Sequence, residues 1–286
     1  MSRSTQTGYE VAVRNFCQFL VAYYNQHTLP ATVQQVASFV AYLSLQGKAP
    51  STIATYMSAI SYKHKIALHQ DPTNNFLVRK LIEGTKRASG QRVDSRRPVT
   101  YEVLVKFLNA LPFLCHNTYE SALFQAAFSL AYFAFLRVGE FTAQSKKAVT
   151  THILQRSDVT IGPNMMDITI RHAKNNQRGS PVIIQIQGLQ GVYRPYCPVA
   201  LLSSYLSLKA KNTNIEGPLF THFDNTPLTR YQFQAVLTKA VKFCNLESAF
   251  YKTHSFRIGA ASSCAAAGVP METIKAWGRW SSTAYR

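Results

Sequence analysis

An apolar run near the middle of the chain restricts the fold more than any other feature. Residues 122–136 are apolar except for Gln125 and Ser129. A membrane-spanning helix needs roughly twenty apolar residues, so this run is too short to cross a bilayer. Because it is apolar on every side, it predicts a helix buried in the core of a folded domain. Arg137 follows this helix directly.

The chain is strongly basic. It carries 31 Lys and Arg residues against 13 Asp and Glu, a formal net charge of +18. Such an excess favours a polyanionic partner, with nucleic acid as the first candidate, an anionic membrane surface as the second and a merely soluble basic protein as the third. Five separated cysteines without metal-ligand spacing indicate free thiols in a reducing, intracellular compartment and argue against a bound metal.

The first 88 residues predict a small helical bundle. Apolar residues recur at helical spacing in four segments, and the first stripe contains Tyr9, Val13, Phe16, Leu20 and Tyr23. Residues 32–35, Thr-Val-Gln-Gln, form a capping box for the second helix. Pro50 begins the third helix and the fourth starts near Asn75. Four helices of this length predict a bundle.

A basic segment separates this bundle from the rest. Residues 86–98 lack apolar periodicity and contain a glycine, a proline and five cations, which is typical of a linker that contacts phosphates. A solvated linker without a binding role is the alternative. We therefore divide the chain into a helical domain over 1–88, a linker over 89–98 and a second domain over 99–286.

The second domain predicts helices and one small sheet. Helices are expected over 100–111, 117–136, 199–211 and 230–244. Between them, three runs alternate apolar and polar residues with period two, which is typical of strands. The runs contain Val159 and Ile161, Ile168 and Ile170, and Val182, Ile184 and Ile186. The fold class is therefore mainly α with a small antiparallel β-sheet.

The last stretch of the chain predicts a phosphate site. His254 and Arg257 are three residues apart, so on a helix they share one face at about 5–6 Å. A glycine and a proline end this helix, and a second short helix leads to Arg279 and Trp280. A histidine, arginines and a ring N–H donor together suit a phosphate.

This stretch resembles the C-terminal signature of the tyrosine recombinases, the phage-integrase family. The resemblance rests on His-x-x-Arg at residues 254–257 and on Trp280, which lies twenty-three residues after Arg257. The Gly-Arg-Trp-Ser-Ser form is similar to that of eukaryotic mobile-element recombinases of the DIRS and Crypton types. The resemblance implies a core-binding, SAM-like DNA-binding domain over 1–88 and an α+β catalytic domain over 99–286. It is strong from Arg137 onward and weak before Pro98.

The resemblance implies a role for each site residue. Arg137 and Arg257 would bind the non-bridging oxygens of the scissile phosphate, with His254 and Trp280 as further donors; the alternative for Arg137 is a structural ion pair with Glu140. Lys174 would protonate the leaving 5′ oxygen, a role that Arg178 cannot fill because arginine keeps its proton. Arg279 competes with Trp280 for its position. Further DNA contacts are expected from basic side chains at Lys63, Lys65, Lys86, Arg87, Arg92, Arg96, Arg97, Arg178 and Arg279.

The family nucleophile is a tyrosine eight or nine residues after the Trp position. Tyr285 comes only five residues after Trp280, so we expect a chain truncated before its nucleophile, with loss of the nucleophile or use of Tyr285 as alternatives. The implied activity is site-specific cutting and rejoining of DNA through a 3′-phosphotyrosyl intermediate, without cofactors or metal. The partner would be double-stranded DNA, bound by a dimer or tetramer, in the nucleus if the host is eukaryotic. Alternatives are a catalytically inactive DNA-binding remnant of a mobile element and a type IB topoisomerase.

Overall fold

The computed structural model describes residues 3–90, 94–171, 181–212 and 216–280. The chain divides into two compact units, residues 1–94 and residues 95–286. Each unit has a hydrophobic core of its own. The fold is mainly helical with a small antiparallel sheet, as the sequence predicts.

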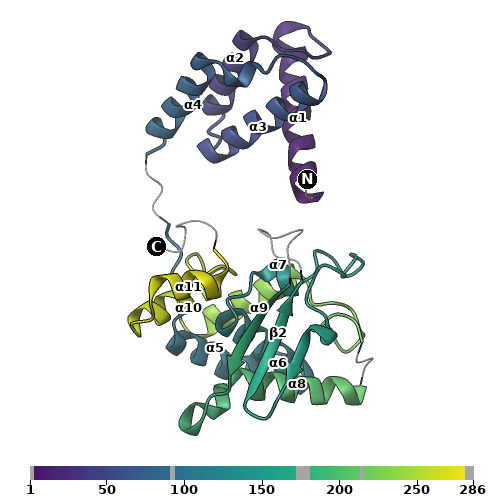
Figure 1. Cartoon of the computed structure of the whole chain (residues 1–286), viewed down its shortest axis with the longest axis vertical. Helices are drawn as coiled ribbons and strands as arrows, with labels where there is room; N and C mark the ends of the chain where they lie inside the picture. The colour runs from purple at the N-terminus through teal and green to yellow at the C-terminus, as the bar shows by residue number, and fades with distance from the viewer. Residues whose placement is uncertain (1–2, 91–93, 172–180, 213–215, 281–286) are drawn as a thin grey trace. The chain divides into compact units, whose positions relative to one another are not determined.

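The first unit is a helical bundle (Figure 1). Its elements are α1 (Arg3–Tyr24), α2 (Val33–Leu45), α3 (Pro50–Ile66), the short 3-10 helix η1 (Pro72–Asn74) and α4 (Phe76–Ala88). The predicted capping box is present at Thr32, whose hydroxyl accepts from the backbone N–H of Gln35 at 3.3 Å, while Gln35 Oε1 accepts from Thr32 N at 2.8 Å. Phe16 and Leu20 of the predicted first stripe are buried in the core, whereas Tyr23, which the stripe also contains, is 63% exposed. Tyr23 comes one residue before the end of α1.

The second unit is organised around α6 (Thr118–Phe133). This helix contains most of the apolar run and is buried along its length, which confirms the predicted core helix. Aromatic rings from other helices meet Phe128, among them Phe233 with ring centroids 5.0 Å away and Phe256 at 5.2 Å. No helix of the described residues is long and apolar enough to span a membrane. The remaining helices are α5 (Tyr101–Leu114), α7 (Val138–Phe141), η2 (Arg156–Asp158), η3 (Gly191–Tyr196), α8 (Pro198–Asn212), α9 (Arg230–Phe243), α10 (Ser255–Ala266) and α11 (Met271–Gly278).

Three antiparallel strands form the sheet of the second unit, in the order β1-β2-β3. They are β1 (Val159–Ile161), β2 (Met165–Ile170) and β3 (Val182–Gln187). In β2, Ile168 pairs with Ile184, and the last pair joins Ile170 to Val182. Alternate residues of β2 are buried, so period two in the sequence correctly predicts the face turned to the core. The predicted turn at 175–179 lies outside the described residues.

The sequence misplaces the end of α6. The expected helix runs to Leu136, but α6 ends at Phe133 and Phe135 adopts a left-handed φ of 49°. Phe135 and Leu136 are apolar because both side chains are buried, although the backbone is no longer helical there. The apolar run is therefore longer than the helix. The reversal matters because it turns the Phe135 carbonyl toward arginines from distant segments.

The chain between the units is attached to the second unit from Ser95 onward. Arg97 N donates to the carbonyl of Phe250 at 2.9 Å, and Val99 N donates to the carbonyl of Ser255 at the same distance. A methyl group on Gly259 would overlap the Val99 carbonyl oxygen, so this close approach requires glycine. The segment therefore runs along the start of α10.

Candidate phosphate-binding site

An arginine cluster forms where three distant segments meet. The turn after α6 brings Arg137, the first turn of α10 brings Arg257, and the end of α11 brings Arg279. The side chains of Arg257 and Arg279 both donate to the carbonyl of Phe135, and Arg137 Nη2 donates to the carbonyl of Arg279 at 3.3 Å, so the three arginines converge on one place. Glu140 contacts two of these arginines. We refer to Arg137, Glu140, Arg257 and Arg279 as the arginine cluster.

Glu140 holds two of these arginines. It is the third residue of α7, and its Oε2 accepts from the backbone N–H of Arg137 at 2.8 Å, as in a capping box. Its Oε1 pairs with Arg137 Nη1 at 3.1 Å, and its Oε2 pairs with Arg279 Nη2 at 2.7 Å. The ion pair of Arg137 with Glu140, which the sequence leaves as an alternative, is thus present.

Arg257 is fully buried, with 1% of its surface exposed. Nη1 donates to the carbonyl of Phe135, and Nη2 donates to the carbonyl of Gly278 at 2.6 Å. Its Nε has no hydrogen-bond partner within the described part of the chain. Burial, together with the charges of Arg137 and Arg279, lowers the pKa of Arg257 to about 9, although Glu140 opposes the shift. A buried cation in this state is stabilised by an added anion.

The Arg279 side chain is largely enclosed, with 8% of it exposed, and its backbone explains why it points inward. It caps α11 in the left-handed conformation, with φ 55°. Its guanidinium donates to the carbonyls of Ala134 at 3.3 Å and Phe135 at 3.1 Å in addition to Glu140. Burial lowers the pKa of Arg279, Glu140 raises it again, and Arg137 adds to the lowering. Three guanidinium groups against one carboxylate leave the cluster with two excess positive charges.

Trp280 supports Arg257 from one side. The Arg257 guanidinium lies 4.6 Å from the centre of the indole ring, and the same ring meets Phe135 edge to face at 5.9 Å. A Cβ on Gly278 would overlap the Trp280 ring, so any other residue at this position would have to displace the indole. The sequence correctly predicts that Arg257 and Trp280 come together.

His254 is exposed, whereas Arg257 is buried. His254 is the residue before α10, with helical φ and ψ angles of −76° and −18°. The sequence predicts that His254 and Arg257 share one helix face, but in the structure His254 faces solvent and Arg257 faces the interior. The reason is that the first turn of α10 packs against the turn after α6. The Arg257 side chain enters that turn, and His254 stays at the surface end of the helix.

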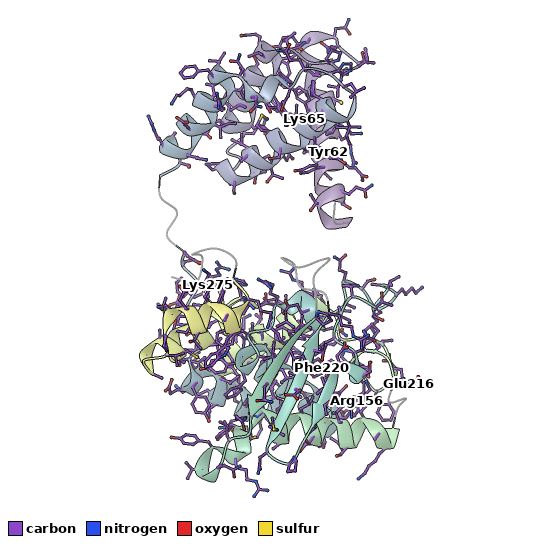
Figure 2. The ribbon with its side chains drawn as sticks, viewed as in Figure 1. Tyr62, Lys65, Arg156, Glu216, Phe220 and Lys275 are labelled. Atoms are coloured by element: carbon purple, nitrogen blue, oxygen red, sulfur yellow. The ribbon has the colours of Figure 1, made fainter. Side chains whose placement is uncertain are left out.

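Several predicted residues lie outside the described residues. They are Arg92, Lys174, Arg178 and Tyr285. Arg279, also predicted as a DNA contact, has a side chain that is only 8% exposed. The remaining predicted DNA contacts are exposed on the surface: Lys63 and Lys65 in the last turn of α3, Lys86 and Arg87 in the last turn of α4, and Arg96 and Arg97 in the segment before α5. Lys65 (Figure 2) lies 3.3 Å from Asp71. Arg97 lies over the ring of Phe250 at 4.5 Å.

Sequence reasoning missed one part of the cluster. It weighed Arg279 as a rival of Trp280 or a DNA contact, whereas Arg279 is an internal partner of Glu140. The two residues are 139 positions apart in the sequence, so no local spacing predicts their contact. The carbonyl groups of Phe135 and Gly278 were also missed, because backbone acceptors carry no sequence signature.

The comparisons with known proteins identify the fold as that of site-specific tyrosine recombinases. The first part of the chain, residues 1–71, matches the family described as phage integrase, N-terminal SAM-like domain. Over nearly the whole length, the structure matches XerH site-specific recombinase bound to a palindromic difH substrate, with a TM-score of 0.69, 17% identity and coverage of 96% of this chain and 73% of that chain.

Two integrases show the same fold. A lambda integrase dimer bound to a COC′ core site matches with a TM-score of 0.61 and 15% identity, covering 99% of this chain and 70% of that one. The Tn1549 transposon integrase in complex with transposon right end DNA matches with a TM-score of 0.62 and 13% identity, covering 99% and 87%. By sequence, the search of curated proteins gives no match. Identities this low establish the fold, and the chemistry rests on the residues of this chain.

Proposed function

We propose that this protein is a site-specific DNA recombinase or integrase that cuts and rejoins DNA through a 3′-phosphotyrosyl intermediate. The observation that carries the proposal is the buried arginine cluster on a recombinase fold. Its excess positive charge and the unpaired Nε of Arg257 favour an anion. A phosphodiester is a charged acceptor, and charge-assisted hydrogen bonds are stronger than those to the neutral carbonyls that now accept from Arg257.

Each residue has a role in this proposal. Arg137 and Arg257 bind the two non-bridging oxygens, and His254 and the Trp280 N–H add donors. Glu140 and Arg279 hold Arg137 in place. Donors fixed in this way stabilise the charge that develops at phosphorus, and removing one such donor typically costs about 10²–10³ in rate.

The covalent step uses a tyrosine oxygen as nucleophile and Lys174 as proton donor. The tyrosine hydroxyl gives up its proton to water, the P–Oη bond forms while the P–O5′ bond breaks, and the proton from Lys174 Nζ moves to the leaving 5′ oxygen. A 5′-hydroxyl from another strand then reverses the step. Energy of the broken bond is kept in the phosphotyrosyl link, so the reaction needs neither ATP nor metal.

Duplex DNA is the proposed substrate, and self-association on it is proposed as a dimer or tetramer. The charge of +18 supports the first, and the DNA-bound recombinases of the same fold, one of them a dimer, support both. The Gly278-Arg279-Trp280 sequence supports a relationship to eukaryotic mobile-element recombinases of the DIRS and Crypton types. The place of action is then intracellular, in the nucleus of a eukaryotic host.

The test is capture of the covalent intermediate. The chain, and any longer natural form of it, is incubated with a library of nicked suicide duplexes, and adducts are sequenced and mapped by mass spectrometry. An adduct through Tyr285 identifies the nucleophile within these residues; an adduct from a longer form alone places it after residue 286. Arg257→Lys retains the positive charge but loses the paired N–H donors of the guanidinium. We expect this variant to bind DNA still, and to form the adduct at least about 10²-fold more slowly. DNA binding without any adduct from either form would overturn the enzymatic proposal and favour a DNA-binding remnant.

A further inference from the structure

Arg279 has a hydrogen-bond donor that its contacts within the protein do not use. Its side chain is 8% exposed, and its Nη1 and Nη2 donate to two backbone carbonyls and to Glu140. The buried Nε of Arg279 has no hydrogen-bond partner within the described part of the chain, and the same holds for the Nε of Arg257. A buried donor without a partner is costly, so its presence indicates a further acceptor.

The two arginines with an unpartnered Nε meet at one backbone atom. Arg257 and Arg279 both donate to the carbonyl oxygen of Phe135, whose left-handed backbone turns that oxygen toward them. Donors that share one acceptor lie close to each other, because each must approach the same oxygen atom within hydrogen-bond distance. An anion that is bound by Arg257 is therefore also close to the guanidinium of Arg279.

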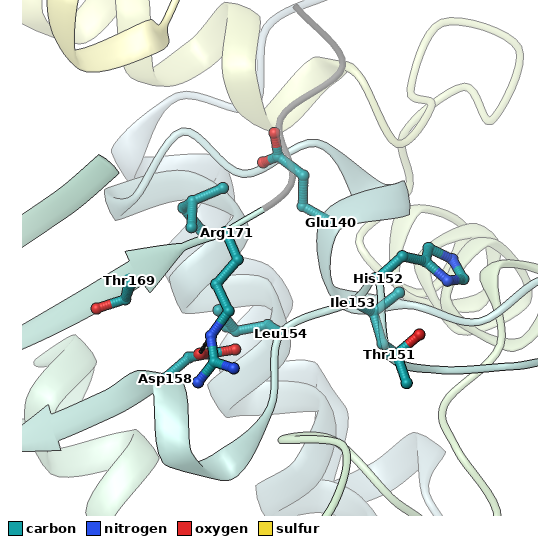
Figure 3. Close-up of a pocket in the computed structure, with 9 residues that line it drawn as sticks. Glu140, Thr151, His152, Ile153, Leu154, Asp158, Thr169 and Arg171 are labelled. Carbon is teal, nitrogen blue, oxygen red and sulfur yellow. Dashed lines mark ion pairs between the residues drawn. The ribbon is translucent and has the colours of Figure 1, made fainter. Parts of the chain in front are cut away.

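Glu140 supplies the counter-charge of the arginine cluster. Its carboxylate pairs with Arg137 at 3.1 Å and with Arg279 at 2.7 Å. Figure 3 shows this carboxylate turned away from Asp158, the other carboxylate that lines the same pocket, and Asp158 pairs with Arg171. Three guanidinium groups and one carboxylate leave two excess positive charges. Without Arg279 the excess would be one.

This excess charge fits the transition state of the proposed reaction better than its substrate. A phosphodiester carries one negative charge, and the attacking tyrosine oxygen brings a second once it has lost its proton. Arg137 and Arg257, with Glu140 beside them, already balance the single charge of the substrate. The charge of Arg279 therefore remains for the second negative charge. An interaction that is stronger in the transition state than in the ground state accelerates the reaction.

We propose that Arg279 is a catalytic residue, an inference that rests on the proposed function. Its guanidinium contacts a non-bridging oxygen of the scissile phosphate and stabilises the negative charge that develops there during attack. This role comes in addition to its ion pair with Glu140. The site is then a set of three arginines rather than two, with Glu140 as their common counter-ion.

The test compares two variants that break the same ion pair. Arg279→Gln removes the positive charge from the site, whereas Glu140→Gln breaks the pair and leaves that charge in place. Rates of adduct formation and DNA affinity are measured with the form of the chain that yields the covalent adduct, and tryptophan fluorescence reports folding. The scissile position carries either the natural phosphate or a methylphosphonate, which has one negative charge less. Arg194→Gln, which removes an exposed arginine from η3 in the same unit, is the matched control.

We expect Arg279→Gln to cleave the phosphate substrate about 10²-fold more slowly than the parent, as for the loss of one preorganised donor. Its DNA affinity should stay within about threefold of the parent, because the lost charge acts in the transition state. On the methylphosphonate, Arg279→Gln should cleave within about threefold of the parent rate, because the second negative charge does not arise there. Glu140→Gln should lose about tenfold less rate than Arg279→Gln on the phosphate, and Arg194→Gln should match the parent on both substrates.

Three results would overturn the inference. Equal losses in Arg279→Gln and Glu140→Gln would mean that Arg279 acts through Glu140 alone. A loss of equal size on both substrates would mean general damage to the site, and unchanged cleavage of the phosphate would mean that Arg279 takes no part. If Arg279→Gln fails to fold, Arg279→Lys decides, because it keeps the charge: cleavage within about tenfold of the parent supports the inference, and a larger loss in the folded variant overturns it. A parent that forms no adduct overturns the proposed function, and this inference with it.

Discussion

A single carboxylate determines how the arginine cluster is held together. Glu140 is 6% exposed and contacts Arg137 through backbone and side chain, and Arg279 through its side chain. Arg137 is itself partly exposed at 18%, so this arginine is the member of the cluster that opens to solvent. The two arginines that pair with Glu140 therefore differ in position. Arg279 pairs with the carboxylate from the interior, whereas Arg137 holds guanidinium N–H groups near the surface.

Removing the charge of Glu140 should destabilise the second unit and increase its affinity for anions. We expect Glu140→Gln to lower the free energy of unfolding by about 3 kcal/mol, because it leaves buried arginines without their counter-charge. Inorganic phosphate should recover more stability in the variant than in the parent, compared with chloride at equal ionic strength. Fluorescence of Trp277 and Trp280 follows this unit selectively, since the chain has no other tryptophan.

The control for this prediction is Glu272→Gln. Glu272 is 81% exposed and lies 3.9 Å from Lys275, so the change should cost less than about 1 kcal/mol. An equal loss in both variants would contradict a special role for Glu140. An unchanged response to phosphate would contradict the anion site.

At the scale of elements, the connection between α3 and η1 depends on Asp71. Its carboxylate accepts from the Ser61 hydroxyl at 2.6 Å and from the hydroxyl of Thr73 at 2.7 Å, and it lies 3.3 Å from Lys65. Burial alone would raise the pKa of Asp71, but these hydrogen bonds outweigh it and lower the pKa to about 2. The ionised carboxylate therefore stabilises the first unit.

The lowered pKa predicts a loss of stability in acid. The contribution of Asp71 is present above its ordinary pKa near 4 and is lost as the pH falls toward 2, because the folded state binds the proton less readily than the unfolded state. We expect Asp71→Asn to remove this pH dependence and to speed hydrogen exchange over residues 57–75 at neutral pH. Exchange should be followed by mass spectrometry, since no tryptophan reports on this unit. Identical pH profiles for variant and parent would refute the assignment.

The start of α10 gives a second prediction at this scale. Alanine normally stabilises a helix relative to glycine by about 1 kcal/mol. Gly259→Ala should instead destabilise the second unit by about 1–3 kcal/mol, because the added methyl group overlaps Val99 and forces the backbone apart. Gly84→Ala in α4 is the matched control, with open space around the new methyl group, and should stabilise its helix. Urea denaturation compares the two; stabilisation by Gly259→Ala would contradict the packing described.

Capping residues and hydrophobic periodicity predict the helices and strands well, but they do not predict the contacts between distant segments. The capping residue Thr32 begins its helix as expected, and period two correctly predicts the three strands. The end of α6 is not predictable in this way, because the left-handed Phe135 is stabilised by donors that come from Arg257 and Arg279. Local sequence has no access to contacts across more than a hundred residues.

The candidate site shows the same division. Arg137 and its pairing with Glu140 follow from a spacing of three residues, and the approach of Arg257 to Trp280 follows from the resemblance of the motif. The inward direction of Arg279 depends on a left-handed backbone at the end of α11, which nothing in the sequence around it requires.

At the scale of the whole molecule, the net charge of +18 predicts binding through phosphates. Observed affinity for duplex DNA should fall log-linearly with salt. Changing Arg92, Arg96 and Arg97 together to glutamine should reduce the slope of log K against log salt by about 2–3, roughly one for each phosphate that is no longer neutralised. The measurement is fluorescence anisotropy between low and physiological salt. A flat salt dependence would contradict phosphate binding, and an unchanged slope would exclude this segment from the DNA interface.

The attachment of residues 95–99 to α10 has a practical consequence for building chimeras. An engineer who exchanges the first 98 residues for those of a relative would cut through a segment that packs against the second unit. The foreign segment would have to reproduce the hydrogen bonds of Arg97 and Val99 and fit against a helix that tolerates only glycine at position 259. A junction before Ser95 leaves this fit intact, so a graft should keep Ser95 to Val99 with the recipient.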